Sequence, residues 1–478
     1  MNYILQRNIW SFCFSIYHII PIRSPQLVRP YSVFRIPSSS KKPSYEMEDP
    51  EEIVLIKNPY LHEQLFVGVI KFFGYGFGML PALPHFISNG KVPTSKALSN
   101  QSYSYVEHGE RVYRSHESKD QLITKFGDVK TLNQSIMRSA KLHPDRRCFG
   151  KRVLLNKKEE FDALNQKMVI KYSFGDFVWK TYEMVWNDVQ NISRFLIDNH
   201  IDSQQNFALF ANTSLEWLTM TLSLLNVSCP IVTVYPSLSD DAITYAFDLT
   251  KITGVLVDEK TLPRLMLIID KLPHLKHVII STHIEPVKTL PEKGSRSIEF
   301  NYFDNVLQYK SDTNPQSHEP QDTNALAVIM FTSGSSGIPK GVMISHKNIL
   351  AVAASVQNNP AINKHHRYAA FLPSSHVFEF FMELAMLLFG STIGFCTPLT
   401  LLDTSPMIQP GTKGDLVVFR PTFMIAVPLF LERVEKGIIQ QLKLKSRIKQ
   451  LLFQTCYSMK MFYRNYGFDT PILDRYPI

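Results

Sequence analysis

Short apolar runs alternate with helical stretches through the middle of this chain, and this alternation limits its folds more than any other feature. Residues 206–211 (NFALFA) and 230–234 (PIVTV) have the apolar, β-branched character of buried strands. Residues 214–225 between them are helical in pattern, with Ser214 as a suitable N-terminal cap. The pattern continues with a helix and two strands at residues 240–249, 254–257 and 277–280. Strands and helices at this spacing predict right-handed crossovers, and hence an α/β fold whose mostly parallel sheet is covered by helices.

The length and composition set the scale of the fold and narrow the classes of ligand. The chain has 478 residues, enough for about three packing units. Hydrophobic residues make up 45% and charged residues 19%, which is typical of a globular protein. The net charge of +9 suits an anionic membrane surface, a polyphosphate ligand or nucleic acid. Because no dense Lys/Arg block with interleaved aromatic residues is found, we expect no nucleic-acid partner.

The five cysteines show neither metal-site nor disulfide spacing. They contain no C-x-x-C pair and no neighbouring histidines at zinc spacing. We therefore expect buried free thiols in a reducing compartment.

The N-terminal part divides into a leader, an apolar segment and a linker. Residues 1–64 are predicted to form a basic leader, whose first 45 residues contain no Asp or Glu. Such a leader is typical of a mitochondrial transit peptide, although an irregular tail explains it as well. Residues 65–87 are apolar with Lys71 as the one charge, and they predict a membrane anchor, spanning or re-entrant; the alternative is a hydrophobic hairpin packed on the protein. Residues 88–139 are predicted to be a polar linker, and residues 140–478 the main domain.

A loop rich in Gly, Ser and Thr follows the apolar run at residues 325–331. An Ala-rich helical stretch with Ser345 as its cap comes after it, so the predicted order is strand, loop, helix. Small residues let backbone N–H groups approach phosphate oxygens, hydroxyls add donors, and Lys340 adds a compact positive charge. The loop is not of the GxxxxGK[ST] type, because Pro339 and Gly341 flank the lysine. The predicted phosphate-binding residues are Thr332, Ser333, Gly334, Ser335, Ser336, Gly337 and Lys340.

The stretch FTSGSSGIPKGVMISHKNI, residues 331–349, closely resembles the signature loop of the adenylate-forming, AMP-binding superfamily. Within that superfamily the chain is most similar to long-chain acyl-CoA synthetases. Three further stretches resemble that branch: LPSSHVFE at 372–379, residues 394–415, and RPTFMIAVP at 420–428. The resemblance covers about two thirds of the chain, but not the leader or the apolar segment.

The resemblance implies a fold, a reaction and a set of site residues. It implies the large N-terminal domain of adenylate-forming enzymes, which joins a fatty acid to AMP and then passes it to coenzyme A. The loop would hold the β- and γ-phosphates of ATP, and Lys340 and His376 would be the catalytic residues. His376 would lie near the acyl carboxylate and the adenylate, although a structural histidine is the alternative. Mg²⁺ would bridge the phosphates, with Thr332 as its protein contact. Glu379 is interpreted as structural.

The resemblance also stops short of the family's pattern. We find no Tyr-Gly-x-Thr-Glu segment and expect the C-terminal lobe to be absent, so that the 478-residue chain alone makes no acyl-CoA. One interpretation is an incomplete copy of a working ligase. The others are a non-catalytic membrane-bound nucleotide-binding module and an adenylating enzyme for another acid. The resemblance to the family favours a location at the endoplasmic reticulum membrane, whereas the leader favours the mitochondrial outer membrane.

Overall fold

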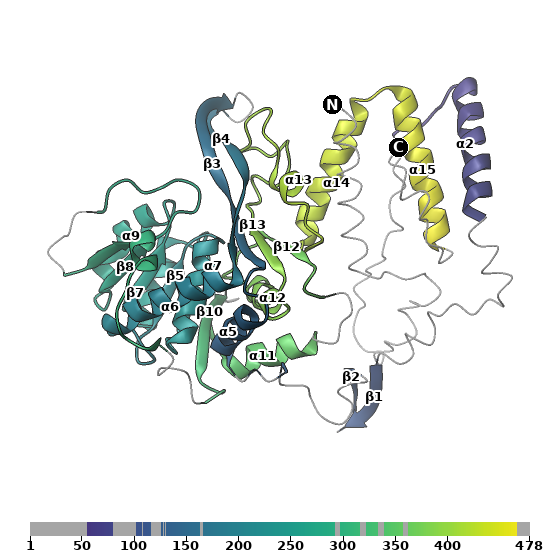
Figure 1. The fold of residues 1–478 in the computed structure, drawn as a ribbon. Helices are drawn as coiled ribbons and strands as arrows, with labels where there is room; N and C mark the ends of the chain where they lie inside the picture. The colour runs from purple at the N-terminus through teal and green to yellow at the C-terminus, as the bar shows by residue number, and fades with distance from the viewer. Residues whose placement is uncertain are drawn as a thin grey trace. The chain divides into compact units, whose positions relative to one another are not determined.

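The computed structural model describes segments that belong to two compact units (Figure 1). The described residues are 55–79, 102–107, 109–115, 126–127, 129, 131–162, 166–291, 297–315, 322–332, 339–356 and 362–465. The larger unit takes its residues from 120–425, and the smaller from 1–119 and 426–478. Most of the predicted leader lies outside the described residues, as do loop residues 333–338.

A seven-stranded sheet in the larger unit confirms the predicted alternation. Its order is β11-β10-β6-β5-β7-β8-β9, and all neighbours are parallel except β10 and β11. The strands are β5 (Phe207–Phe210), β6 (Ile231–Thr233), β7 (Gly254–Val257), β8 (His277–Ile280), β9 (Glu299–Tyr302), β10 (Leu326–Thr332) and β11 (Lys340–Ser345). All four strands predicted before residue 281 are present. Their carboxyl ends lie at one edge of the sheet, where ligands bind in open α/β folds.

Helices cover this sheet as the pattern predicts. They are α6 (Tyr182–Asp198), α7 (Leu215–Asn226), α8 (Asp240–Leu249) and α9 (Leu262–Ile268). Side chains of α8 and α9 share one buried apolar cluster with strand residues such as Phe210 and Val257. Every residue of α7 is buried, and the Ser214 hydroxyl accepts a hydrogen bond from the Trp217 N–H, which confirms the predicted cap.

Two connections differ from the expectation. Residues 281–323, which are polar and for which no strand was predicted, contain β9 and α10 (Phe303–Leu307), and β9 pairs with β8 as an edge strand. The predicted order strand, loop, helix is also wrong, because β11 lies between the loop and helix α11 (His346–Ser355). Strands β9 and β11 both lie at sheet edges. Strand β11 is largely exposed and β9 is largely half-buried, so both lack the continuous apolar run that marks a buried strand.

A second sheet of five strands completes the larger unit. Its order is β14-β12-β13-β3-β4, with β3 and β4 as a long antiparallel hairpin and the other neighbours parallel. The strands are β3 (Arg147–Asp162), β4 (Lys167–Thr181), β12 (Arg367–Ala370), β13 (Thr392–Phe395) and β14 (Phe423–Met424), and its helices are α5 (Leu132–Leu142), α12 (Val377–Leu388) and α13 (Asp415–Phe419). The Trp217 ring of α7 meets the Phe380 ring of α12 at 6.0 Å between centroids, which joins the helices of the two sheets in one core.

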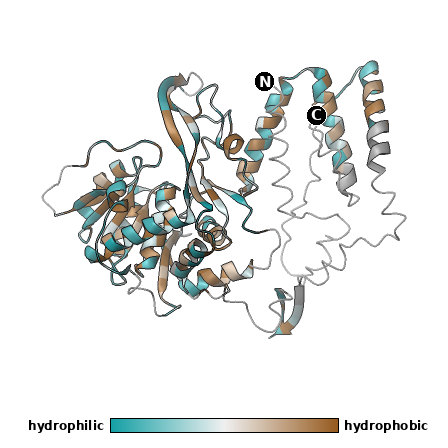
Figure 2. Cartoon of the chain, viewed as in Figure 1, coloured by the Kyte–Doolittle hydropathy of each residue, from teal (hydrophilic) through white to brown (hydrophobic). Residues whose placement is uncertain are grey.

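Helices dominate the smaller unit. Its described elements are α2 (Leu61–Met79), the hairpin β1 (Ser102–Glu107) and β2 (Glu110–Ser115), α14 (Pro428–Lys443) and α15 (Arg447–Asn465). Helix α2 packs against α15, and both α14 and α15 mix polar and apolar residues along their length (Figure 2). The hairpin lies within the stretch predicted as a polar linker, where alternation of Tyr and Val with polar residues is its one local signal.

The predicted membrane-spanning segment is not supported by the structure. None of the helices in the described residues is both long and apolar enough to cross a bilayer. The predicted segment began at residue 65, but α2 begins at Leu61 and brings Glu63 with it. Glu63 is 4% exposed and its Oε1 lies 2.7 Å from Arg447 Nε of α15, so this face of α2 is bound to protein. Residues 80–87 of the predicted segment lie outside the described residues.

Candidate functional site

Thr332 and Lys340 mark the two ends of the Gly/Ser-rich loop. They are paired residues on the antiparallel strands β10 and β11, so the loop is the connection of a hairpin. The loop therefore leaves the sheet at the carboxyl end of β10, next to the end of β6. The Lys340 side chain is exposed and makes no ion pair with any residue that the structure describes. Its ammonium group is thus available to an anionic ligand at the loop.

Close packing between β10 and β11 explains why a glycine follows Lys340. A Cβ atom at Gly341 would lie 2.9 Å from Ile329 Cγ2 and 3.3 Å from the Phe331 ring. Glycine therefore lets β11 pass the side chains of β10 closely enough to form the ladder. The next turn of chain is fixed by a capping box, in which the Ser345 hydroxyl and the Asn348 side chain each accept a backbone N–H. The ladder and the capping box therefore fix the chain that follows Lys340.

His376 lies where the carboxyl ends of the two sheets meet. It immediately precedes α12, and its ring lies 6.3 Å from the Tyr235 ring, in an edge-on arrangement. Tyr235 follows β6, the parallel neighbour of β10. The structure thus brings the predicted histidine to the same edge of the sheet as the predicted loop.

The imidazole of His376 has a defined role in the fold. Its Nδ1 accepts a hydrogen bond of 3.2 Å from the Phe378 N–H and so caps α12. An accepting Nδ1 in a neutral ring requires the hydrogen to be on Nε2. The side chain is exposed, so this Nε2–H is available to donate to an oxygen of a ligand. The structural role uses Nδ1, and the ligand-binding role predicted as its alternative would use the other nitrogen of the ring.

Two threonines tie the turn before His376 to the seven-stranded sheet. Thr213, just after β5, donates from its hydroxyl to the Leu372 carbonyl at 2.6 Å and accepts the Ser374 N–H at 2.8 Å. Thr233, at the end of β6, donates to the Ser375 carbonyl at 3.5 Å. These contacts place the chain entering α12 at the switch point around β5, where connections leave the sheet in opposite directions.

The residues at this edge fit a magnesium ion that is held mainly by its ligand. The described residues contain no group of three His, Cys, Asp or Glu side chains that could hold a metal ion. Magnesium prefers phosphate oxygens and waters to an all-protein cage. The Thr332 hydroxyl is exposed at the start of the loop, so it fits as a single neutral contact.

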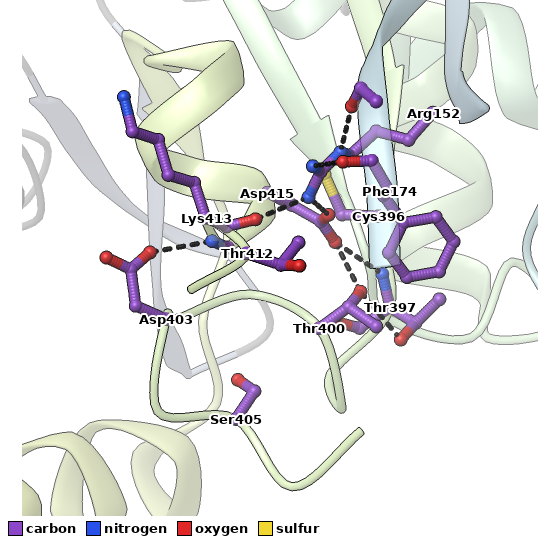
Figure 3. A network of polar contacts seen from close by, with 12 residues as sticks. Arg152, Phe174, Cys396, Thr397, Thr400, Asp403, Ser405, Thr412, Lys413 and Asp415 are labelled. Carbon is purple, nitrogen blue, oxygen red and sulfur yellow. Dashed lines mark hydrogen bonds and ion pairs between the residues drawn. The ribbon is translucent and has the colours of Figure 1, made fainter. Parts of the chain in front are cut away.

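A second polar network lies on the five-stranded sheet (Figure 3). The Arg152 guanidinium donates to the carbonyls of Phe174, Gly175 and Lys413 at 2.7–2.8 Å and lies 3.1 Å from Asp415 Oδ1. Asp415 also accepts a short hydrogen bond from the Thr400 hydroxyl. The network attaches residues 397–415, which belong to the 394–415 stretch that resembles the long-chain branch, to the β3–β4 hairpin.

Burial raises the pKa values of an acid and a thiol in this network. Asp415 is 3% exposed, and burial raises its pKa even though Thr400 and Arg152 act in the opposite direction. Burial also raises the pKa of Cys396, so this thiol is neutral and unsuited to nucleophilic attack. All four cysteines in the described part of the chain are free, as predicted; three are buried, whereas Cys456 is half-buried, and Cys13 lies outside the described residues.

Comparison with known proteins decides the family. The chain matches the profile of the family described as AMP-binding enzyme over residues 156–461, which is more than half of its length. This chain belongs to the AMP-binding enzyme family. The AMP-binding match includes both ends of the phosphate loop, His376 and the Arg152-bound stretch at 397–415.

Curated relatives of this AMP-binding chain carry long-chain acyl-CoA synthetase names. It is 33% identical over 325 residues to "Long chain acyl-CoA synthetase 8" of Arabidopsis thaliana, covering 68% of the chain and 45% of the relative. It is 28% identical to "Long-chain-fatty-acid--CoA ligase 2" of Schizosaccharomyces pombe, covering 73% of the chain and 52% of the relative. The chain thus spans about half the length of the curated relatives it matches.

A solved structure supports the fold of the AMP-binding domain. The adenylation domain of a carboxylate reductase from Mycobacterium chelonae matches with a TM-score of 0.56 and 17% identity, covering 73% of this chain and 54% of that one. The predicted α/β adenylate-forming fold with mixed, mostly parallel sheets is therefore confirmed.

Sequence reasoning missed several residues of this site. Tyr235 follows a correctly predicted strand, and the rule that ligands bind beyond strand ends would have found it. Arg152 and Thr213 had no local signal, because Asp415 lies 263 residues from Arg152 in the sequence and Leu372 lies 159 residues from Thr213. Glu379, interpreted as structural, is 1% exposed and accepts the Tyr368 hydroxyl at 2.7 Å.

Proposed function

We propose that this chain carries the ATP-binding part of a long-chain fatty acid–CoA ligase. One observation supports this most directly: Lys340, the exposed Thr332 hydroxyl and the Nε2–H of His376 lie on elements that meet at the carboxyl edge of β6 and β10. A cation and neutral donors at this edge suit the anions of an adenylation reaction, which are triphosphate and carboxylate.

The proposed reaction has two steps. A fatty-acid carboxylate oxygen attacks the α-phosphorus of ATP, which forms acyl-AMP and releases pyrophosphate. The sulfur of coenzyme A then attacks the acyl carbonyl, which forms acyl-CoA and releases AMP. In the first step Lys340 and the loop neutralise the β- and γ-phosphates, and His376 orients the carboxylate by donating from Nε2. Bound Mg²⁺, with Thr332 as its protein contact, would neutralise phosphate charge.

The long-chain acid is proposed from two supports. The matched relatives are named for long-chain substrates, and the 397–415 stretch that resembles the long-chain branch is fastened by the buried Arg152–Asp415 pair. We would measure the affinity of the purified chain for non-hydrolysable adenylate analogues with acetyl, octanoyl and palmitoyl groups. Tightest binding of the palmitoyl analogue is expected. Tighter binding of a short or aromatic acyl group would instead indicate an adenylating enzyme for another acid.

We also propose that the chain associates with a membrane surface, with the endoplasmic reticulum as the expected location. Leu61, Leu65 and Val69 lie one helical turn apart on α2 and are 54–74% exposed, on the face opposite Glu63. An exposed apolar stripe of this kind suits the surface of a bilayer, and the net charge of +9 favours anionic lipid. Cell fractionation tests the organelle: recovery with mitochondria and absence from microsomes would contradict the location.

A further inference from the structure

A continuous chain of hydrogen bonds runs from α12 to the turn that carries His376. Glu383 Oε1 lies 2.8 Å from Ser374 Oγ, and Ser374 Oγ lies 3.0 Å from Thr213 Oγ1. Thr213 Oγ1 in turn lies 2.6 Å from the Leu372 carbonyl oxygen and 2.8 Å from the Ser374 N–H. Leu372 and Ser374 are both within four residues of His376. This series of hydrogen bonds therefore joins the segment after β5, helix α12 and the turn that carries His376.

The hydrogen atoms available to this series of hydrogen bonds can be counted. The Leu372 carbonyl has no hydrogen, so the Thr213 hydroxyl must donate to it. Thr213 then accepts at the 3.0 Å contact, and the Ser374 hydroxyl must donate there. The one hydrogen of Ser374 is thereby used, so the 2.8 Å contact with Glu383 needs a hydrogen from the carboxyl group itself. An ionised Glu383 would leave one of these contacts as two oxygens with no hydrogen between them.

The surroundings of Glu383 agree with a carboxylic acid. Glu383 is 0% exposed, and no Lys, Arg or His side chain is paired with it among the described residues. Its Oε2 has no hydrogen-bond partner in the described structure, which a neutral carbonyl oxygen tolerates far better than a carboxylate. Burial raises the pKa of Glu383 well above its usual value, and the neighbouring Glu379 acts in the same direction.

The groups facing Glu383 supply no opposing charge. Glu379 lies one turn earlier on α12, and its carboxyl accepts from the Tyr368 hydroxyl of β12. Burial raises the pKa of Glu379 to about 8 and keeps the Tyr368 phenol neutral by raising its pKa. Ser374 and Thr213 are uncharged. The pocket around Glu383 is thus an apolar site with neutral hydroxyls, in which a carboxyl group keeps its proton.

We infer that Glu383 is a neutral carboxylic acid that donates to Ser374 and, through Ser374 and Thr213, positions the turn bearing His376. Glu383 touches no ligand in this account, so it is a positioning residue. The part of the inference that concerns His376 rests on the proposed function, whereas the protonation of Glu383 does not. Because each hydroxyl in this turn can donate in one direction only, the turn has a single arrangement. That arrangement keeps His376 at the sheet edge where Lys340 lies.

The protonation of Glu383 is tested first by infrared spectroscopy of the full 478-residue chain at neutral pH. A protonated carboxyl group gives a carbonyl stretch that an ionised one lacks, and deuterium exchange shifts it. We expect Glu383→Gln to remove one such band. Glu379→Gln is the matched control, because it removes a different band and leaves that of Glu383. Absence of any band that Glu383→Gln removes would overturn the inference, whatever the chain binds.

The positioning role is tested by affinity for ATP and for a non-hydrolysable palmitoyl-adenylate analogue. Glu383→Gln keeps a donor and should bind the analogue as the wild type does, whereas Glu383→Ala should bind it about tenfold more weakly with ATP affinity unchanged. Thr213→Ser should behave as the wild type and Thr213→Val as Glu383→Ala. The pairs guard against a folding defect, because each contains a variant that keeps the hydrogen bond.

The outcomes separate the inference from the proposed function. Equal analogue affinity for Glu383→Ala, Glu383→Gln and the wild type would overturn the positioning role. Equal weakening by Gln and Ala would overturn the donor role. If the wild type binds neither ATP nor the analogue, the proposed function fails, and the infrared band alone then decides whether Glu383 is a neutral donor.

Discussion

The guanidinium of Arg152 and the carboxylate of Asp415 lie 3.1 Å apart, although 263 residues separate them in the sequence. Their side chains are 5% and 4% exposed, so this is a buried ion pair. Arg152 also donates to three backbone carbonyls (Figure 3), so the contacts with Asp415 and the carbonyls use four of its five N–H donors. The pair is buried and hydrogen-bonded to the backbone, and it attaches the 397–415 stretch to the β3–β4 hairpin.

Removal of one member of this pair should destabilise the chain strongly. We expect Arg152→Ala to lower the free energy of unfolding by about 3 kcal/mol, because it leaves Asp415 buried without its partner and three carbonyls without a donor. The double variant with Asp415→Asn should lose less than the sum of the single losses. Urea denaturation measures each value. Strict additivity would show that the two side chains do not interact.

The buried glutamates predict a dependence of stability on pH. Glu379 has its pKa raised from 4.5 to about 8 by burial, so its proton is released when the chain unfolds between these pH values. Because its pKa is raised in the folded chain, Glu379 contributes most to the free energy of unfolding at low pH. This contribution is lost as the pH rises through that window. The stability of the wild type relative to Glu379→Gln should fall by about 1.4 kcal/mol per pH unit within it. A pH-independent difference would contradict this account.

His376 should show two separable roles, one for each ring nitrogen. His376→Ala removes the cap of α12 and the exposed donor, so we expect a loss of about 1 kcal/mol in stability together with weaker binding of an acyl-adenylate analogue. His376→Asn restores a good cap, so stability should return while analogue binding stays weak. Thermal unfolding and calorimetric titration measure the two effects. Recovery of both properties in the Asn variant would show that the cap alone matters.

The apolar stripe on α2 should govern attachment to lipid. We expect Leu65→Ser and Val69→Ser together to reduce the fraction of the chain that floats with anionic phospholipid vesicles, because both side chains are exposed. Val67 is half-buried and lies nearer the face of α2 that packs on α15, so Val67→Ser should instead lower the stability of the chain. Vesicle flotation in a density gradient measures binding. Undiminished flotation of the double variant would contradict the membrane proposal.

The sequence predicted the parts of the fold whose signals are local. The buried strands β5, β6, β7 and β8 have apolar runs, and the caps at Ser214 and Ser345 depend on residues within one turn. The edge strands β9 and β11 lack such runs, and the polar β3–β4 hairpin was likewise not anticipated.

The candidate site divides in the same way. Lys340 and His376 stand in short motifs, and the fold brings both to one edge of a sheet. Tyr235, Thr213 and Glu383 act through contacts between distant segments. Those contacts depend on which strands neighbour each other and on which way α12 faces, so no single window of sequence contains the information.

The central claim is that the loop ending at Lys340 binds the triphosphate of ATP, and the affinity of the Lys340→Ala chain for ATP tests it most directly. We expect a loss of about 10- to 100-fold by calorimetric titration, because a charge-assisted contact contributes about 1.5–3 kcal/mol. Lys347→Ala, which removes an exposed lysine seven residues later on α11, should leave the affinity unchanged. Wild-type affinity for ATP in the Lys340→Ala chain would contradict the account.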